Sequence, residues 1–130
     1  MMDKDYEDIP GTFVFDADRS REGYWLNQFC ITMRLASARD AFRDDPEEYM
    51  SRFAMTEDQK QAIRDRAWNR LLELGGNIYY TSKLAAFDGI VFQDLAAEMT
   101  GMKREDYRDM MLKGGRDIEG NRSKSEWEKD

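Results

Sequence analysis

Apolar residues in the first third of the chain recur with the period of an α-helix. They fall at spacings of three or four along one stripe that comprises Leu26, Phe29, Cys30, Met33 and Ala36. Side chains at such spacings share one face of a helix, and that face is the one a protein buries. The pattern therefore predicts a first core helix that begins near Asp16 to Ser20.

Two further helices are marked by the residues that open them. Asp45-Pro46-Glu47-Glu48 supplies a capping aspartate, a proline at the first helical position and a glutamate three residues after the cap. Thr56 to Gln59 follows the same capping logic, and an apolar series at helical spacing comes after it: Ile63, Ala67, Leu71 and Leu74. Gly75-Gly76 ends this series, so we expect one long helix before it.

The C-terminal half shows helical spacing in three segments. These are Ile78 to Phe87, then a segment with Phe92, Leu95, Ala96 and Met99, and then one with Tyr107, Met110 and Met111 that ends at Gly114-Gly115. The apolar run from Thr12 to Phe15 is too short to build a sheet. The chain is thus predicted to be all-α, a compact bundle of about six short to medium helices with extended N-terminal and C-terminal segments.

Length and composition set the domain organisation. A chain of 130 residues has the usual size of one domain, so residues 1–130 are expected to form a single folded unit. The end of the chain, 117–130, is polar and charged apart from Trp127 and is predicted to be a flexible tail.

The charge and cysteine content exclude several classes of protein. A formal net charge of −7 argues against nucleic acid, because phosphate binding needs a clustered excess of Lys and Arg. No apolar run is long enough to span a membrane, and the N-terminus is acidic rather than basic and then apolar. The single cysteine, Cys30, fits a reducing compartment, so a cytoplasmic location is expected.

The chain contains no histidine, which removes most autonomous mechanisms. Histidine is the usual group for proton transfer near neutral pH and a common ligand of iron and zinc. No catalytic residue and no metal ligand is therefore predicted within this chain. Cys30 lies in an apolar stripe and is expected to be buried and inert, and Gly75-Gly76 and Gly114-Gly115 are interpreted as helix stops.

The acidic run from Asp44 to Glu48 has two interpretations. Carboxylates alone can bind Mg²⁺ or Ca²⁺, which would make the chain a carboxylate-only metal enzyme. Helix capping explains the same positions and is favoured, since the spacing of an EF-hand is missing.

Four ordered stretches carry a further signal. They are Asp8-Ile9-Pro10-Gly11-Thr12 with Val14-Phe15; Gly23-Tyr24 with Leu26-Asn27-Gln28-Phe29; Gly75-Gly76-Asn77-Ile78-Tyr79 with Ser82-Lys83-Leu84; and Asp88-Gly89 with Phe92-Gln93, Met99-Thr100-Gly101-Met102, Tyr107, Met110-Met111 and Gly114-Gly115-Arg116. Their order and spacing resemble the small, or alpha, subunits of protocatechuate 4,5-dioxygenases, which are class III extradiol ring-cleaving enzymes. The resemblance spans Asp8 to Arg116, although no single stretch is a catalytic motif.

The resemblance implies a division of labour between two subunits. In this family a large beta subunit carries Fe(II) with its histidine and glutamate ligands, and the helical alpha subunit covers the active site. The implied assembly is a hetero-oligomer of the alpha2beta2 type that opens the ring of a catechol carboxylate with O₂. The substrate stays open between protocatechuate, gallate and another catechol carboxylate.

The same resemblance assigns candidate residues for a substrate pocket. Phe92 occupies the family position whose aromatic ring reaches the substrate, where an apolar ring would exclude water and discriminate by shape. Thr100, Gly101 and Met102 follow as weaker candidates for contact with substrate or partner. The alternative for Phe92 is packing with Leu95 and Ala96. The family often has a capping threonine where Lys103 stands, so that helix start is expected to lack a side-chain cap.

A second function stays open beside this one. A helical module could keep the same scaffold and yet dock onto, or regulate, a different protein. Association with a large iron-carrying subunit would distinguish the dioxygenase subunit from such a docking or regulatory module.

Overall fold

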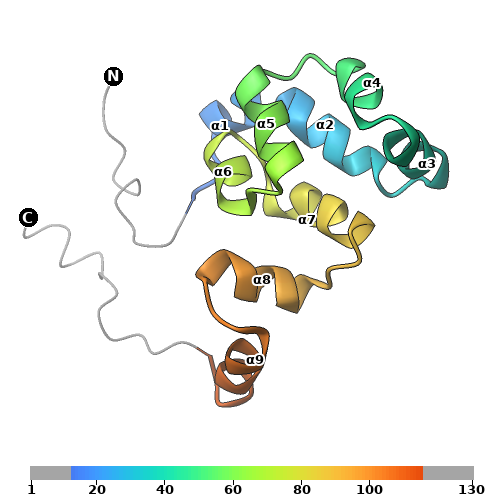
Figure 1. The fold of residues 1–130 in the computed structure, drawn as a ribbon. Coiled ribbons are helices and arrows are strands. Elements are labelled where there is room, and N and C mark those ends of the chain that lie inside the picture. The colour runs from blue at the N-terminus through green and yellow to red at the C-terminus, as the bar shows by residue number, and fades with distance from the viewer. Residues whose placement is uncertain (1–12, 116–130) are drawn as a thin grey trace, which may run out of the picture.

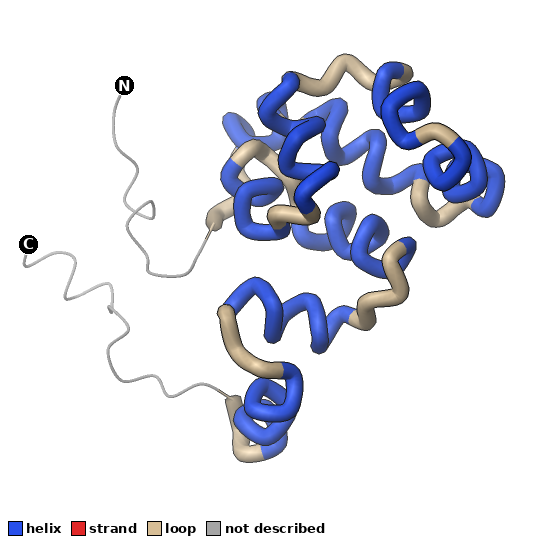
Figure 2. Tube along the Cα trace, viewed as in Figure 1, coloured by secondary structure: helices blue, strands red, loops and turns tan. Residues whose placement is uncertain are grey.

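The computed structural model describes residues 13–115, and every regular element in that part of the chain is an α-helix (Figures 1 and 2). In chain order the helices are α1 (Ala17–Glu22), α2 (Tyr24–Thr32), α3 (Ala36–Asp44), α4 (Pro46–Ser51), α5 (Glu57–Asp65), α6 (Trp68–Glu73), α7 (Ile78–Phe87), α8 (Phe92–Thr100) and α9 (Arg104–Leu112). The all-α prediction is confirmed. The predictions for residues before Phe13, and for the tail at 117–130, lie outside the described residues. None of the helices between residues 13 and 115 has the length and apolar character needed to cross a lipid bilayer.

The first predicted helix is interrupted twice. A helix begins near Asp16 as expected, with the Asp16 side chain as its cap, but α1 ends at Gly23 and α2 starts directly after it. The prediction that Ala36 continues the buried stripe is wrong, since α2 ends at Thr32 and Ala36 opens α3 with an exposed side chain. The extended backbone of Leu35 redirects the chain, so that α3 buries a face of its own.

The long helix predicted between Thr56 and Gly75 is also two helices. Thr56 and Gln59 form the expected capping box at the start of α5, which ends at Arg66. Arg66 adopts a left-handed conformation (φ 50°, ψ 42°), which is uncommon for a residue other than glycine. Its guanidinium holds the carboxylate of Asp88 through two contacts of 2.6 and 3.2 Å. This ion pair joins the break between α5 and α6 to the end of α7.

The core lies where α2 packs against α7, with α6 also in contact with α7 (Figure 1). Leu26, Phe29 and Cys30 of α2 are fully buried. Three aromatic rings surround Phe29. The distance from the centroid of the Phe29 ring is 5.2 Å to Phe42, 5.6 Å to Phe53 and 5.9 Å to Tyr49. The pairs with Phe42 and Phe53 are edge-to-face, an arrangement that stabilises the core beyond the burial of the rings. The predicted Asp45 cap is present and directs α4, which carries Tyr49 into this cluster.

Two glycines bring the chain into backbone contact at the junction of α1 and α2. A Cβ atom on Gly23 would lie only 1.9 Å from the carbonyl oxygen of Gly75, so neither position has room for a side chain. The buried amide of Asn27 donates to the same Gly75 oxygen at 3.1 Å and accepts from the backbone N–H of Asn77 at 2.9 Å. The amide of Gln59 donates to the carbonyls of Glu22 and Leu74 at 3.0 Å. We call this set of residues the glycine junction.

Helices α8 and α9 extend from the body formed by α1 to α7 (Figure 1). Asn69 of α6 donates to the carbonyl of Met99 at 2.9 Å and so ties α8 to the body. Helix α9 buries none of its own residues and packs against α8. The carboxylate of Asp94, with a side chain only 10% exposed, holds α9 through Arg108 at 2.9 Å and Arg104 at 3.6 Å. As expected, Lys103 begins α9 without a side-chain cap.

Candidate functional site

The N-terminal end of α8 presents two large apolar side chains to solvent. Val91 and Phe92 are each 60% exposed, whereas Leu95, one turn further along, is 1% exposed. Phe92 follows a turn at Asp88-Gly89, which separates α7 from α8. In the folded chain the Phe92 ring therefore does not belong to the hydrophobic core, even though Leu95 on the same helix does.

 

Two hollows flank the Phe92 ring. The first has a volume of about 530 Å³ and lies between α7 and the connection to α8; its lining residues are Ser82, Lys83, Ala86, Gly89, Ile90, Val91 and Phe92. The second is a groove of about 330 Å³ along one face of α8, lined there by Phe92, Leu95, Ala96, Met99 and Thr100, and across from it by Phe13, Asn69, Leu72 and Ile78. Both volumes lie in the range typical of small-molecule sites. Phe92 is thus the side chain that the two hollows share.

The other three candidates lie at the opposite end of α8. Thr100 is eight residues beyond Phe92, which is about 12 Å along a helix. Its hydroxyl donates to the carbonyl of Ala97 at 2.8 Å, and its side chain lines the same groove as Phe92. Gly101 ends the helix with φ 75°, and Met102 follows it half-buried. Neither of these two lines the groove, so the structure brings together Phe92 and Thr100 but not Gly101 or Met102.

Lys83 and Ser82 lie in the first hollow with Phe92, although neither was predicted as a site residue. The Lys83 ammonium lies over the Tyr79 ring, 4.7 Å from its centroid. The Ser82 hydroxyl donates to the backbone carbonyl of Tyr79 at 2.8 Å. In the sequence, the one sign that pointed to Ser82 and Lys83 was the stretch Ser82-Lys83-Leu84, which is among those that carry the resemblance. Its link to Phe92 became visible only through the packing of α7 against α8.

Other residues in the resembling stretches serve the fold. Gly23, Asn27 and Gly75 belong to the glycine junction, and Asn77 of the same junction also caps α7 by accepting from the backbone N–H of Tyr79 at 2.8 Å. Backbone contacts as close as these tolerate few other residue types. The second stretch and the first part of the third therefore shape the body from which α8 extends.

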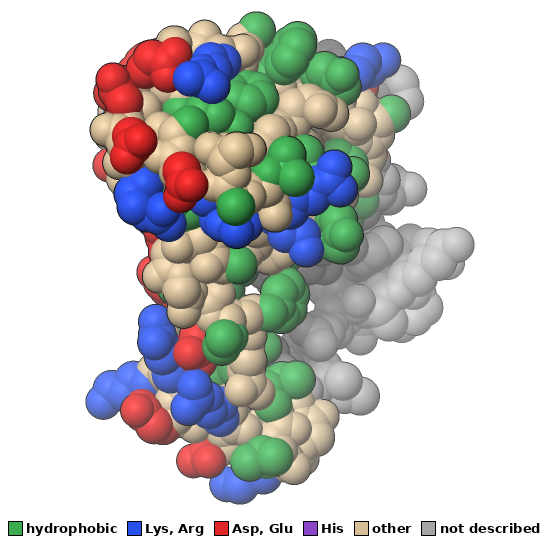
Figure 3. Space-filling view, turned by 90° about the vertical axis from the view of Figure 1, so that its right-hand side faces the viewer, with side chains coloured by type: hydrophobic (Ala, Val, Ile, Leu, Met, Phe, Trp, Pro, Cys, Tyr) green, Lys and Arg blue, Asp and Glu red, His purple; other side chains and the backbone are tan. Residues whose placement is uncertain are grey.

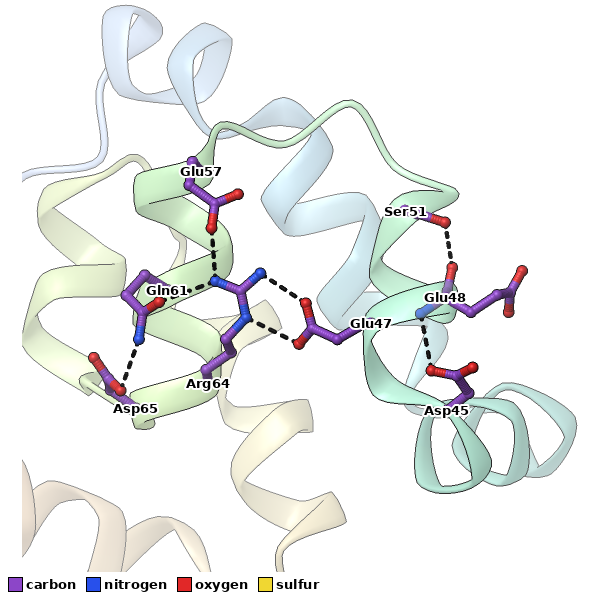
Figure 4. A network of polar contacts seen from close by, with 8 residues as sticks. All are labelled: Asp45, Glu47, Glu48, Ser51, Glu57, Gln61, Arg64 and Asp65. Carbon is purple, nitrogen blue, oxygen red and sulfur yellow. Dashed lines mark hydrogen bonds and ion pairs between the residues drawn. The ribbon is translucent and has the colours of Figure 1, made fainter.

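Three acidic residues of the run from Asp44 to Glu48 have structural partners: Asp45 caps α4, Glu47 pairs with Arg64 (Figure 4), and Glu48 pairs with Arg52 at 2.9 Å. Asp45 accepts from the backbone N–H of Glu48 at 3.2 Å. Arg64 of α5 donates to both carboxylate oxygens of Glu47 at 2.7 and 2.9 Å, and to Glu57 at 2.8 Å. The hydrogen bond from Arg64 lowers the pKa of Glu47 below its usual value. The contacts of Arg64 join α4 to α5, and Asp45, Glu47 and Glu48 are already engaged by partners within the chain.

Residues 13–115 contain no group of three or more His, Cys, Asp or Glu side chains that could hold a metal ion. Cys30 is fully buried, and this burial raises the pKa of its thiol to about 12. The thiol therefore stays protonated near neutral pH and is a poor nucleophile and a poor metal ligand. The donor set of the described chain does not fit an iron centre.

The face that contains the connection between α7 and α8 has a mixed character. Figure 3 shows that the molecule narrows there between its main body and α9. Hydrophobic side chains lie at the narrow part, next to a band of Lys and Arg side chains on the body. This local basic band contrasts with the formal net charge of −7 for the whole chain.

Comparison with known proteins places this architecture in a family. Residues 26–112, from α2 to α9, match the family model described as aromatic-ring-opening dioxygenase LigAB, LigA subunit. A gallate dioxygenase from Pseudomonas putida strain KT2440 is 31% identical over 101 residues, which cover 78% of this chain but 30% of that protein. The chain thus corresponds to less than a third of the length of this relative. Since the family match covers most of the helical body, including the residues of α7 and α8 that line the two hollows beside Phe92, the chain belongs to the family of LigA subunits of the LigAB aromatic-ring-opening dioxygenases.

Proposed function

We propose that this chain is the alpha subunit of an extradiol dioxygenase that opens the ring of a catechol carboxylate. The observation that carries the proposal is Phe92, an aromatic ring 60% exposed between two hollows on a chain of the LigA family. Exposure of so large an apolar side chain to water is unfavourable, and its burial under a second surface lowers the free energy. The partner is the large beta subunit, in an alpha2beta2 hetero-oligomer.

Fe(II) in this proposal belongs to the beta subunit, where it would coordinate the catechol hydroxyls and O₂. The alpha subunit acts through shape and exclusion of water. Phe92 would close the catalytic cleft from above and bound the pocket beside the substrate ring. Thr100 would line the same wall further along α8, in the groove that it shares with Phe92. Gly101 and Met102 would face the partner beyond the end of that helix.

The substrate class follows from the relative rather than from geometry. Gallate is a trihydroxylated benzoate, so the matched relative is named for a substrate with adjacent ring hydroxyls and a carboxylate. Protocatechuate has the same carboxylate and one hydroxyl fewer. A catechol carboxylate is therefore the proposed class, and gallate and protocatechuate are its first two members to test.

Co-expression with the large subunit tests the proposed function. We expect the two chains to copurify and to cleave a catechol carboxylate with consumption of O₂, while this chain alone has no activity. A panel of protocatechuate, gallate and catechol would identify the preferred ring. If the chain binds a different protein and never supports ring cleavage, the alternative of a docking or regulatory module replaces this function.

Replacing Phe92 by valine should change substrate preference without unfolding the chain. Because the ring is mostly exposed, the free energy of unfolding of the isolated chain should change by less than about 0.5 kcal/mol. In the complex the ratio of kcat/KM between differently substituted catechols should change about 10-fold, since the lost ring enlarges the pocket. Steady-state kinetics on the substrate panel measures this ratio.

Leu35→Val is the matched control for Phe92→Val, because Leu35 is also a large exposed apolar residue, 50% exposed, at the start of α3. It should leave both the ratio and the stability close to the values of the unmodified chain. An unchanged ratio in Phe92→Val would remove Phe92 from the pocket wall.

A further inference from the structure

Lys83 places a positive charge in the hollow that Phe92 borders. Its side chain and the Phe92 ring line the same space of about 530 Å³, and no Asp or Glu is among the lining residues. Within residues 13–115 no carboxylate lies within ion-pair distance of the Lys83 ammonium, which lies 4.7 Å from the centroid of the Tyr79 ring. A hollow with one cation, an aromatic wall and apolar neighbours has the character of a site for an aromatic anion.

Several arginines of the described chain differ from Lys83 because a carboxylate is already paired with each of them. Arg66 contacts Asp88 at 2.6 Å, and Arg64 contacts Glu47 at 2.7 Å. In the first turn of α8, Asp94 is held by Arg108 of α9 at 2.9 Å. An anion that approached these arginines would have to displace an acidic side chain, whereas at Lys83 it would displace only water and the weaker contact with Tyr79.

We propose that Lys83 receives the carboxylate of the aromatic substrate and thereby sets the preference for catechols that bear one. The inference rests on the proposed function and deepens it, since it assigns a polar contact to the site that Phe92 covers. Lys83 comes from α7 and Phe92 from the start of α8, and the turn between them holds both at one hollow. The cation would meet the carboxylate while the ring bounds the apolar part of the substrate.

Covering of the hollow by the large subunit would strengthen this contact. Lys83 is half-buried in the chain by itself, so water screens its charge there. When a second surface excludes that water, a charge-assisted hydrogen bond to a carboxylate becomes stronger. Loss of such a bond typically raises KM by about 10-fold to 100-fold.

Steady-state kinetics of the assembled complex tests the proposal with Lys83→Gln and Lys83→Arg. In Lys83→Gln the KM for protocatechuate and gallate should rise at least about 10-fold, with a smaller change in kcat. The KM for catechol and 4-methylcatechol, which have no carboxylate, should stay within about 2-fold. Lys83→Arg keeps the charge and should restore most of the affinity for the carboxylated rings. Lys60→Gln removes a lysine charge from α5 and is the matched control, with kinetics like those of the unmodified complex.

Three outcomes would overturn the role of Lys83. An unchanged KM for the carboxylated rings would show that their carboxylate binds elsewhere. An equal rise for charged and uncharged rings would make Lys83 a general structural element of the pocket. If the Lys83→Gln chain, unlike the unmodified chain, did not copurify with the large subunit, Lys83 would belong to the subunit interface. Failure of the proposed function is distinguishable from all three, because the unmodified chain would then form no active complex.

Discussion

Gly23→Ala should lower the free energy of unfolding of the chain by about 3 kcal/mol or more, with a fall in melting temperature of more than about 10 °C. The added methyl group would lie 1.9 Å from the carbonyl oxygen and 2.3 Å from the carbonyl carbon of Gly75. These atoms are backbone, held in turn by the amide of Asn27, so they cannot swing aside as a side chain could. Thermal unfolding of the isolated chain, followed by far-ultraviolet circular dichroism, measures the effect.

The sign of the Gly23→Ala effect makes this a sharp test. The backbone of Gly23 has φ −95°, which alanine adopts readily, so without the clash the substitution would stabilise the chain by about 0.4 to 1 kcal/mol. Gly89→Ala is the control, since Gly89 has φ 82° and open space around its Cβ position. It should cost about 1 to 2 kcal/mol through backbone strain alone. A Gly23→Ala chain that melts at or above the temperature of the unmodified chain would contradict the close contact of the glycine junction.

Chelation of ferrous iron should abolish ring cleavage by the complex and leave the stability of this chain unchanged. The chain has no histidine, and its described residues form no cluster of metal ligands. A metal bound to the folded state would stabilise it by about 2.7 kcal/mol at one hundred times its dissociation constant. We therefore expect the same melting temperature for the isolated chain with Fe(II) and with a chelator, and recovery of the activity of the complex when Fe(II) is restored.

The chelation experiment also separates the two subunits. A rise in the melting temperature of this chain on addition of Fe(II) would assign metal ligands to it and contradict the division of labour. Activity of the complex that survives complete removal of iron would contradict the proposed extradiol reaction instead. The Gly23→Ala result bears on neither point, because it concerns only the fold of this chain.

The site could be predicted in part. The resemblance led to Phe92, and the structure then located that ring on the surface between two hollows. The role of Phe92 as a pocket wall remains a prediction, as do the contacts of Thr100, Gly101 and Met102. Lys83 was not predicted as a site residue because nine positions separate it from Phe92, and α7 must first pack against α8. Spacing along the chain carries no information about such a pair.

Local sequence sufficed wherever the physical cause was local. The starts of α1, α4 and α5 depend on Asp16, Asp45 and Thr56, whose side chains bond to backbone groups three residues away. A cap of this kind is complete within one turn of helix, so the order of residues is enough to predict it. The all-α class follows in the same way from apolar spacing, and the absence of histidine is a property of composition.

The breaks between helices depended on contacts between distant segments. Gly23 divides α1 from α2 where it touches Gly75, fifty-two positions later, and Arg66 leaves the helical conformation where it binds Asp88. Apolar spacing continues across the break at Arg66, because Ile63 before it and Leu71 after it are both fully buried in the same core. The helical pattern therefore predicted which residues are buried near these points, whereas packing between α1, α6 and α7 set where the helices end and which side chains meet at the hollow beside Phe92.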